Sequence, residues 1–340
     1  MIVKLETLER QLQQAAARFV SPEEAIYFAA MSLETHLRKA PRMNPLEDAV
    51  RDLKVWAGTP ERQFSVEVDK AGVMVLNFNG LAPALKMKSL HDQLESRARR
   101  CGIAALGFPN SSGMITLNPW SEGLARRELI GLAMFNGGTR CTVPYGGTRG
   151  VFGTLPLAYA IPTEDRPIIL DMALTEIPFF QIKKAKETGT PLPEGAAVDR
   201  QGRPTTDAAA ALGEDGVANL LPIGGGVKGY GLVMLAEILT GALVRSLLSS
   251  EQTPGWHPPE YGALLLAIDI GSFTDLAVFK AAVSALCHAL RAQAPAQGFE
   301  GVIIPGDRGH ASAAAARSAG EIEVKDQVMA ELEQLAAPAT

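Results

Sequence analysis

The sequence contains little cysteine and little histidine, and each shortage excludes a class of site. Its three cysteines, Cys101, Cys141 and Cys287, are odd in number and lie far apart in the chain. They form neither a disulfide framework nor a zinc-binding motif, which favours a reducing, cytoplasmic location. None of the five histidines pairs with another at the i, i+4 spacing or clusters with a cysteine. We therefore expect no metal ion in the functional site.

The sequence also has no long apolar run and no excess of basic residues. The most apolar helix candidate, residues 229–244, contains Glu237 and is shorter than the roughly 20 residues that a bilayer requires. Residues 1–19 are charged and amphipathic, unlike a targeting segment. A net charge of −5 gives no general electrostatic footprint for nucleic acid. We therefore predict neither a membrane nor a nucleic acid as a partner. A G-x-S-x-G motif, the commonest hydrolase signal, is also missing.

Apolar residues, in contrast, make up 47% of the 340 residues, and charged residues make up 20%. This composition supplies a large buried core and excludes a disordered chain. Helical spacing dominates up to residue 56, and strand-like alternation begins at residue 64. From residue 102 to 170, short apolar runs alternate with glycine and proline turns, which indicates several strands.

The second half of the chain alternates between polar loops and apolar elements. We predict a surface loop at 188–207, a strand at 264–268 and another at 302–304, and helices at 229–244, 275–292, 311–319 and 326–335. The pattern predicts an α/β protein. We divide it into a helical region 1–70, a mixed α/β region 71–300 and a segment 301–340 that packs back on the N-terminal part.

The most distinctive local motif is the glycine-rich run Leu221–Gly231 (LPIGGGVKGYG), which opens into an apolar helix. Its glycines satisfy G-x-G-x-x-G, but no clear strand precedes them and no βαβ unit encloses them, so the Rossmann match is weak. A Walker A motif is excluded because Gly229 follows Lys228. Two interpretations stay open: a phosphate cradle at a helix N-terminus, or a tight turn packed against a core helix.

Other turns share this close-approach character, notably those at 144–147, 153–156 and 305–308. Asp171 ends an apolar strand. A carboxylate at that position is typical of a ligand site, although capping of a helix explains such residues more often.

Taken together, several passages resemble the malate/L-lactate dehydrogenase family of the second type, which includes sulfolactate and ureidoglycolate dehydrogenases and piperideine-2-carboxylate reductases. The matching passages are GVFGTLPLAYAIP at 150–162, ILDMALT at 169–175, LPEGAAVDRQGRPTTD at 192–207, LPIGGGVKGYG at 221–231 and IPGD at 304–307. The resemblance implies a mixed-sheet cofactor fold rather than a Rossmann sheet. It also implies NADH or NADPH as cofactor, small 2-oxo acids or imines as substrates, and a homodimer with active sites near the subunit interface.

The resemblance also implies where the dinucleotide binds. Carried over by position, the expected cofactor contacts are Asn136, Gly153, Thr154, Leu170, Asp171, Met172, Ala173, Thr175, Lys228, Gly229, Gly306 and Asp307. These residues are kept. The choice between NADH and NADPH stays open.

At the positions that bind and convert the substrate, by contrast, the sequence departs from the family pattern. The family's Ser-His-Gly, which supplies the general acid, is absent, and an ungapped alignment places Arg38-Lys39-Ala40 there. Lys39 therefore occupies the position of the histidine. His36 lies three residues earlier and could replace that histidine only if the loop is rearranged. Lys39, His36 and Asp171 are the catalytic candidates.

Three further positions depart from the family pattern. The arginine that would clamp the substrate carboxylate falls on Met43, with Arg42 beside it as the substrate-binding candidate. A second family histidine falls on Gly113, and the usual Gly-Thr-Asn-Pro has Leu155 in place of asparagine.

These departures predict an NAD(P)H-dependent reductase with an altered substrate, an imine or an unusual 2-oxo acid derivative. Hydride transfer to a ketone leaves an alkoxide that needs a proton, which imidazole supplies better than an ammonium does at neutral pH. An iminium ion arrives protonated and needs no such donor. The alternative is a catalytically silent relative that binds a nucleotide or a partner. A third interpretation, the fold without the dinucleotide, is disfavoured because Lys228, Gly229 and the Pro-Gly-Asp turn are intact.

Overall fold

The structure is a computed structural model that describes residues 1–39, 44–59, 61–114, 116–253 and 260–337. At its centre is a seven-stranded sheet with the order β2-β3-β4-β10-β5-β6-β7. The strands are β2 (Ser65–Lys70), β3 (Val73–Asn77), β4 (Ile103–Ser111), β5 (Leu129–Asn136), β6 (Leu157–Ile161), β7 (Ile168–Met172) and β10 (Tyr261–Asp269). Neighbours run antiparallel except β3 and β4, which are parallel. The sheet is therefore mixed, unlike the parallel sheet of a Rossmann fold.

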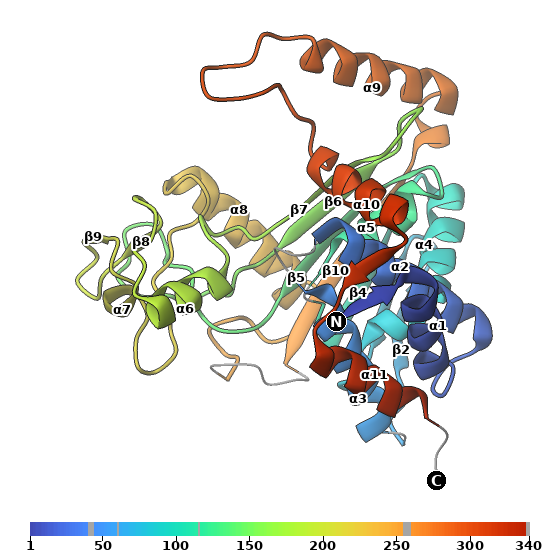
Figure 1. Cartoon of the computed structure of the whole chain (residues 1–340), viewed down its shortest axis with the longest axis horizontal. Helices are drawn as coiled ribbons and strands as arrows, with labels where there is room; N and C mark the ends of the chain where they lie inside the picture. Colours follow the sequence, from blue (N-terminus) through green and yellow to red (C-terminus); the bar gives the residue numbers. More distant parts are fainter. Residues whose placement is uncertain (40–43, 60, 115, 254–259, 338–340) are drawn as a thin grey trace.

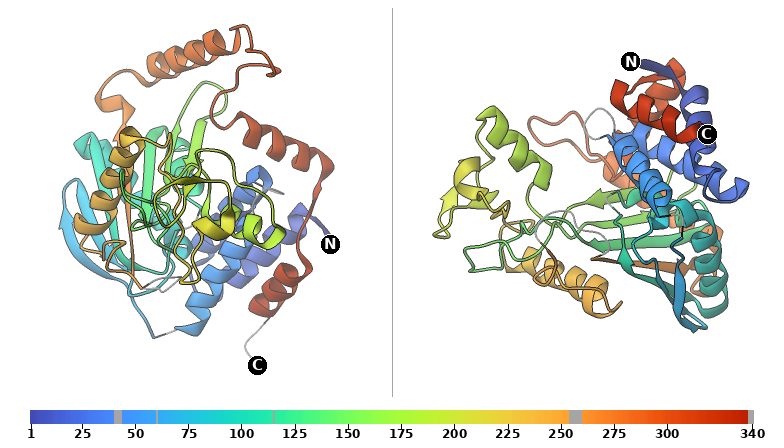
Figure 2. Two further views of the ribbon diagram at one scale, coloured as in Figure 1. Left: turned by 90° about the vertical axis from the view of Figure 1, so that its left-hand side faces the viewer. Right: turned by 90° about the horizontal axis from the view of Figure 1, so that it is seen from below.

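Strand β10 lies in the middle of this sheet although it comes late in the chain. Seven of its nine residues are buried, so both faces of the strand are covered. One face of the sheet carries α4 (Met87–Cys101) and α5 (Asn118–Ala125). The other carries α8 (Val227–Glu237) and its π-helical continuation η2 (Ile238–Ala242) (Figure 2).

The two ends of the chain form one layer beside the sheet. Strand β1 (Ile2–Lys4) pairs antiparallel with β11 (Glu321–Glu323). The helices α1 (Leu5–Ala16), α2 (Pro22–Lys39), α3 (Pro45–Gly58), α10 (Asp307–Ala319) and α11 (Asp326–Ala336) pack around one shared core. Figure 1 shows these blue and red segments side by side. Strand β2, within the expected helical region 1–70, belongs instead to the edge of the central sheet.

A smaller lobe extends from the sheet at residues 177–225 (Figure 1). It contains α6 (Phe179–Thr188), β8 (Ala197–Val198), β9 (Pro204–Thr205) and α7 (Ala208–Ala211). Ile182, Leu192 and Ala196 are buried in a separate small core. The stretch 188–207, expected as a surface loop, therefore also covers this core and forms the β8–β9 hairpin.

Helix α9 (Leu276–Arg291) stands apart from the rest of the chain, at the top of Figure 1. Asp275 caps it by accepting hydrogen bonds from the backbone N–H groups of Ala277 and Val278. Only Ser284 and Cys287 of this helix are buried. The expected strand at 302–304 does not form, because these residues lack a β partner. Within the described ranges, no helix combines the length and hydropathy that a bilayer crossing requires.

Candidate active site

Lys39 and Asp171 meet at the end of α2, although they lie far apart in the sequence. Lys39 is the last residue of α2, and its Nζ lies 2.5 Å from Oδ2 of Asp171 on strand β7. The side chain of Lys39 is 18% exposed and that of Asp171 is 8% exposed, so the pair is largely shielded from bulk water. An ion pair in such a setting is held in one geometry rather than exchanging with solvent.

The N-terminus of α5 contributes two further donors to the same carboxylate. The backbone N–H groups of Leu117 and Asn118 donate to Oδ2 of Asp171 at 3.2 Å and 3.1 Å. Unpaired N–H groups at a helix start favour an anion, and the helix dipole acts in the same direction. Asp171, on β7, is therefore held by two other elements, α2 and the start of α5.

The pair opens onto a groove between the end of α2 and the small lobe. Its far wall comes from α6 and the segment that follows, and includes Phe180, Gln181 and Lys184. Phe180 is 44% exposed, which leaves an apolar side chain in contact with solvent at this wall. The groove therefore presents the Lys39 ammonium beside both apolar and cationic side chains.

Strand β7 is the outer strand of the sheet, and most of the expected cofactor residues gather along it. At its start, the Ile169 N–H donates to the Pro305 carbonyl at 3.0 Å. A Cβ on Gly306 would lie 3.1 Å from the Ile169 nitrogen, so only glycine leaves this approach uncrowded. Asp307 forms two contacts with Arg291, at 2.7 Å and 3.3 Å.

The far end of β7 adjoins the other two turns. The Leu174 N–H donates to the Thr154 carbonyl at 2.9 Å, and the Ile223 N–H donates to the Leu174 carbonyl at 2.9 Å. The segment 170–175 therefore lies between the Gly153-Thr154 turn and the glycine-rich turn. The Thr175 hydroxyl is buried and has no hydrogen-bond partner among the residues that the structure describes. This unpaired hydroxyl lies just beyond the far end of β7, where it fits a bound polar cofactor.

The glycine-rich run forms a tight turn that packs against the first turn of α8. A Cβ on Gly229 would lie 1.8 Å from the Ile223 carbonyl oxygen, so the turn requires glycine there. Gly224 and Gly225 have φ values of 72° and 64°. Lys228 is exposed beside them. Close packing of the turn and a helix N-terminus available to a phosphate therefore occur together in this segment.

Two expected residues, Asn136 and His36, have different surroundings. Asn136 is fully buried, and it accepts from the Gly262 N–H at 2.8 Å and donates to the Leu247 carbonyl at 3.1 Å. Its polar atoms therefore tie β5 to neighbouring backbone. His36 is buried, and burial lowers its pKa to about 4. It does not line the groove and is neutral at pH 7. Arg42, with Met43, lies outside the described residues.

A second cavity, between α2, α3 and the segment before α5, contains residues that the sequence analysis missed. Gly113 and Met114 line it together with Asp48, Arg51 and Asp52. Asp48 accepts from the Thr116 hydroxyl at 3.1 Å. Burial raises the pKa of Asp52 to about 6 despite its ion pair with Arg51. Helical spacing placed these carboxylates on α3, but only the packing of α3 reveals their burial.

Comparison with known proteins identifies the family. Residues 3–333 match the model of the malate/L-lactate dehydrogenase family. The chain belongs to this family. It is 33% identical to the (2R)-3-sulfolactate dehydrogenase (NADP(+)) of Chromohalobacter salexigens over 279 residues, which is 80% of this chain and 78% of that protein. It is 39% identical to a Δ1-pyrroline-2-carboxylate/Δ1-piperideine-2-carboxylate reductase of Pseudomonas putida over 61% of this chain and 58% of that protein.

Solved structures agree with this assignment. Sulfolactate dehydrogenase from Methanocaldococcus jannaschii superposes with a TM-score of 0.83 and 25% identity, covering 98% of this chain and 96% of that one. Δ1-Piperideine-2-carboxylate reductase from Pseudomonas syringae pv. tomato gives 0.80 and 27%, covering 98% and 99%. The resemblance and the mixed-sheet fold that the sequence predicted are confirmed. As a member of this family, the chain is a nicotinamide-dependent oxidoreductase.

Proposed function

We propose that this chain is an NAD(P)H-dependent reductase of an imine or another unusual 2-oxo acid derivative. The observation that carries the proposal is the 2.5 Å contact between Lys39 Nζ and Asp171 Oδ2, at the position where the family has its histidine. The resemblance to a pyrroline- and piperideine-2-carboxylate reductase supports an imine substrate. The contact holds Lys39 at the groove rather than in solvent, which supports Lys39 as the replacement for that histidine.

The chain's own residues suit this chemistry. The Asp171 carboxylate orients Lys39, and the N–H groups of Leu117 and Asn118 hold that carboxylate in place. Lys184, in the far wall of the groove, adds a second cation that favours a substrate carboxylate. An iminium substrate needs no proton from the protein as it is reduced. The lysine then has to position the substrate rather than protonate an alkoxide.

The edge of β7 is the proposed binding line for the cofactor. Gly306 and Asp307 lie at its start, the Gly153-Thr154 turn at its end, and Lys228 beside the glycine-rich turn. Leu170, Met172, Ala173, Thr175 and Gly229 complete the proposed contacts, with Asn136 supporting β5. When bound, NADH or NADPH supplies the hydride.

We also infer a homodimer. Helix α9 exposes Val278, Leu286 and Leu290 at 62%, 56% and 41%. On the face of the sheet opposite α4 and α5, α8, η2 and the residue after η2 expose further apolar side chains, namely Leu232, Leu235, Ile238 and Leu243. Contiguous apolar faces of this kind are unusual on a monomer and support association with a second copy.

The test compares a cyclic imine with a simple 2-oxo acid. Oxidation of NADPH and of NADH is followed at the nicotinamide absorbance with Δ1-piperideine-2-carboxylate and with pyruvate. We expect the imine to be reduced much faster than pyruvate. We also expect Lys39→Ala to lower kcat/KM by about 10²-fold, as for loss of a group that positions the substrate.

Lys325→Ala is the matched control. Lys325 also forms an ion pair, with Glu47, but this pair is exposed and does not line the groove. Equal rates for pyruvate and the imine would exclude the imine preference. An unchanged Lys39→Ala enzyme would exclude Lys39 from catalysis. Binding of the nucleotide without turnover of any substrate would favour the alternative, a silent nucleotide-binding relative.

A further inference from the structure

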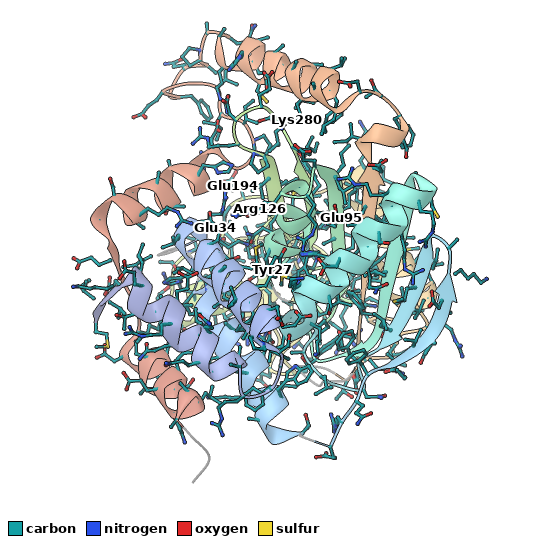
Figure 3. All side chains as sticks on the ribbon, turned by 90° about the vertical axis from the view of Figure 1, so that its right-hand side faces the viewer. Tyr27, Glu34, Glu95, Arg126, Glu194 and Lys280 are labelled. Atoms are coloured by element: carbon teal, nitrogen blue, oxygen red, sulfur yellow. The ribbon has the colours of Figure 1, made fainter. Side chains whose placement is uncertain are left out.

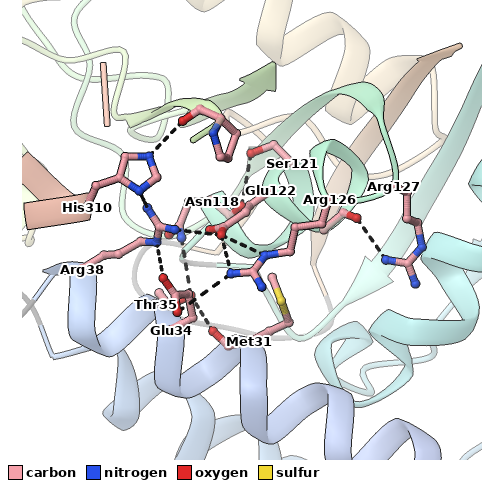
Figure 4. Close-up of polar contacts among 12 residues, drawn as sticks. Met31, Glu34, Thr35, Arg38, Asn118, Ser121, Glu122, Arg126, Arg127 and His310 are labelled. Atoms are coloured by element: carbon pink, nitrogen blue, oxygen red, sulfur yellow. Dashed lines mark hydrogen bonds and ion pairs between the residues drawn. The ribbon is translucent and has the colours of Figure 1, made fainter. Parts of the chain in front are cut away.

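The residue before Lys39 lies at the centre of a buried network of charged groups (Figure 4). The Arg38 guanidinium forms an ion pair through Nε with Oε1 of Glu34 at 2.9 Å and another through Nη2 with Oε1 of Glu122 at 2.9 Å. Its Nη1 donates to Nδ1 of His310 at 2.8 Å. Arg38 thus connects α2 to α5 and α10 from a side chain that is only 9% exposed.

Two outer arginines complete this network. Arg126 binds the same Glu122 oxygen at 2.7 Å and faces Glu34 across the gap between α5 and α2 (Figure 3). Arg317 on α10 pairs with Glu34. Glu122 is 1% exposed, and its charge is compensated by Arg38 and Arg126. Both arginines are about half exposed, at 51% and 54%, and hold the network from its rim.

His310 continues the network to strand β7. Its Nδ1 accepts from Arg38, so the ring is neutral and its Nε2–H donates to the Pro167 carbonyl at 2.9 Å. Pro167 directly precedes β7, the strand that carries Asp171. The chain of contacts therefore runs from α2 through α10 to the start of β7.

The same elements supply the groups of the active site. Helix α2 carries Lys39, β7 carries Asp171, and α5 supplies the N–H groups of Leu117 and Asn118. Successive helical residues point about 100° apart, so Arg38 faces α5 and α10 while Lys39 faces Asp171. One buried guanidinium therefore sets the mutual positions of the elements that form the Lys39–Asp171 pair.

We propose that Arg38 is a positioning residue that fixes Lys39 against Asp171 by clamping α2 to α5 and, through His310, to β7. The proposal rests on the proposed reductase function, in which Lys39 acts at the reaction centre. The guanidinium suits this task because its planar fork donates to Glu122 and His310 while its charge also pairs with Glu34. Neither a lysine nor a neutral side chain reproduces that geometry.

The first experiment is a double-mutant cycle between Arg38→Met and Lys39→Ala. Rates are measured with the imine substrate, which needs no protein proton and leaves residual turnover in Lys39→Ala. Arg38→Met should lower kcat about 10- to 100-fold in the wild-type background, as expected for a displaced catalytic group. In the Lys39→Ala background it should lower kcat less than about threefold, because residues that act as a unit are not additive. A merely structural role predicts the same loss in both backgrounds, which would overturn the proposal.

The second experiment does not depend on activity. The rate at which acetic anhydride modifies Lys39 is followed by mass spectrometry, with the exposed Lys325 as internal reference. Arg38→Met should raise the rate at Lys39 several-fold and leave Lys325 unchanged. Arg127→Gln, which removes an arginine that pairs with Asp92 and Glu95 rather than with Glu34 or Glu122, is the matched control and should change neither rate.

Arg38→Lys carries both experiments if Arg38→Met does not fold, since it retains the charge but not the fork. Unchanged modification and turnover in the folded Arg38 variant would overturn the proposal. If no substrate is turned over but Lys39 protection depends on Arg38, the reductase function fails while the positioning role holds.

Discussion

At the scale of single residues, several histidines owe their state to burial rather than to chemistry. His91 is fully buried, accepts from the Tyr27 hydroxyl at 2.8 Å and donates to the Trp120 carbonyl at 2.9 Å. This pairing requires a neutral ring, and burial lowers the pKa of His91 to about 3. His36 resembles it, with a pKa of about 4. Neither is a proton donor at pH 7. Lys39 therefore remains the cationic catalytic candidate at the groove.

A pH dependence of stability follows from these two histidines. The pKa values in the folded chain, about 3 and about 4, lie below the 6.5 of an unperturbed histidine. As the pH falls below about 6.5, the unfolded chain takes up protons first, so stability is lost. At pH 5, each histidine should lower the free energy of unfolding by about 2 kcal/mol. Asp52, with its pKa raised to about 6, acts in the opposite sense below pH 6.

The measurement is the free energy of unfolding by urea between pH 8 and pH 5 for the wild type and His91→Gln. The fall toward pH 5 should be about 2 kcal/mol smaller in the variant. The contributions of His36 and Asp52 cancel because both proteins contain them. Above pH 7 the two curves should run parallel. Equal slopes down to pH 5 would show that His91 is not held neutral by burial.

At the scale of elements, the beginning of α8 combines a conformational requirement with an exposed cation. The Ile223 carbonyl lies where a Cβ of Gly229 would be, whereas nothing lies within 4 Å of the Cβ position of Gly231. Both glycines occupy the first turns of the same helix. Substituting each of them with alanine therefore separates the effect of close packing from the effect of helix propensity.

Gly229→Ala should lower the free energy of unfolding by about 1–3 kcal/mol, because the turn must shift to admit a methyl group. Gly231→Ala should raise it by up to about 1 kcal/mol, since alanine favours the helix and the site is open. Chemical denaturation measures both effects. Gly229→Ala should also weaken nucleotide binding in a calorimetric titration, because the displaced turn carries Lys228. Similar stabilities for the two variants would contradict the packing argument.

At the scale of the whole molecule, the exposed apolar faces decide the association state. Ile26 on α2 is also 52% exposed, but it lies outside α8, η2 and α9. It therefore provides a matched control for an apolar residue in one of these faces, such as Leu286 on α9.

Light scattering at micromolar concentration should give twice the chain mass for the wild type and for Ile26→Glu. Leu286→Glu should shift the population toward the monomer, because a buried carboxylate without a partner opposes association. A wild-type monomer would exclude the homodimer and weaken a site completed at a subunit interface. A dimer that persists in Leu286→Glu would show that this part of α9 is not in the interface.

Local patterns determined much of this protein. The apolar run of β10, the amphipathic spacing of α1, α2 and α11, and the extent of α9 are properties of neighbouring residues, so local patterns revealed them. The motif-bearing passages likewise predicted the family and its mixed sheet, which the comparisons confirm. At 302–304 the local pattern was wrong, because a strand also needs a partner edge and none is adjacent.

Only the tertiary structure decided which of these residues act together. Lys39 and Asp171 are separated by 132 positions, and no pattern in either segment predicts their contact. Their approach depends on a buried arginine that the spacing of α2 could not distinguish from a solvated one. Periodicity records which face of an element is buried. The partners on that face are set by the packing of α2, α5, α10 and β7, which brings distant charges close enough to compensate one another.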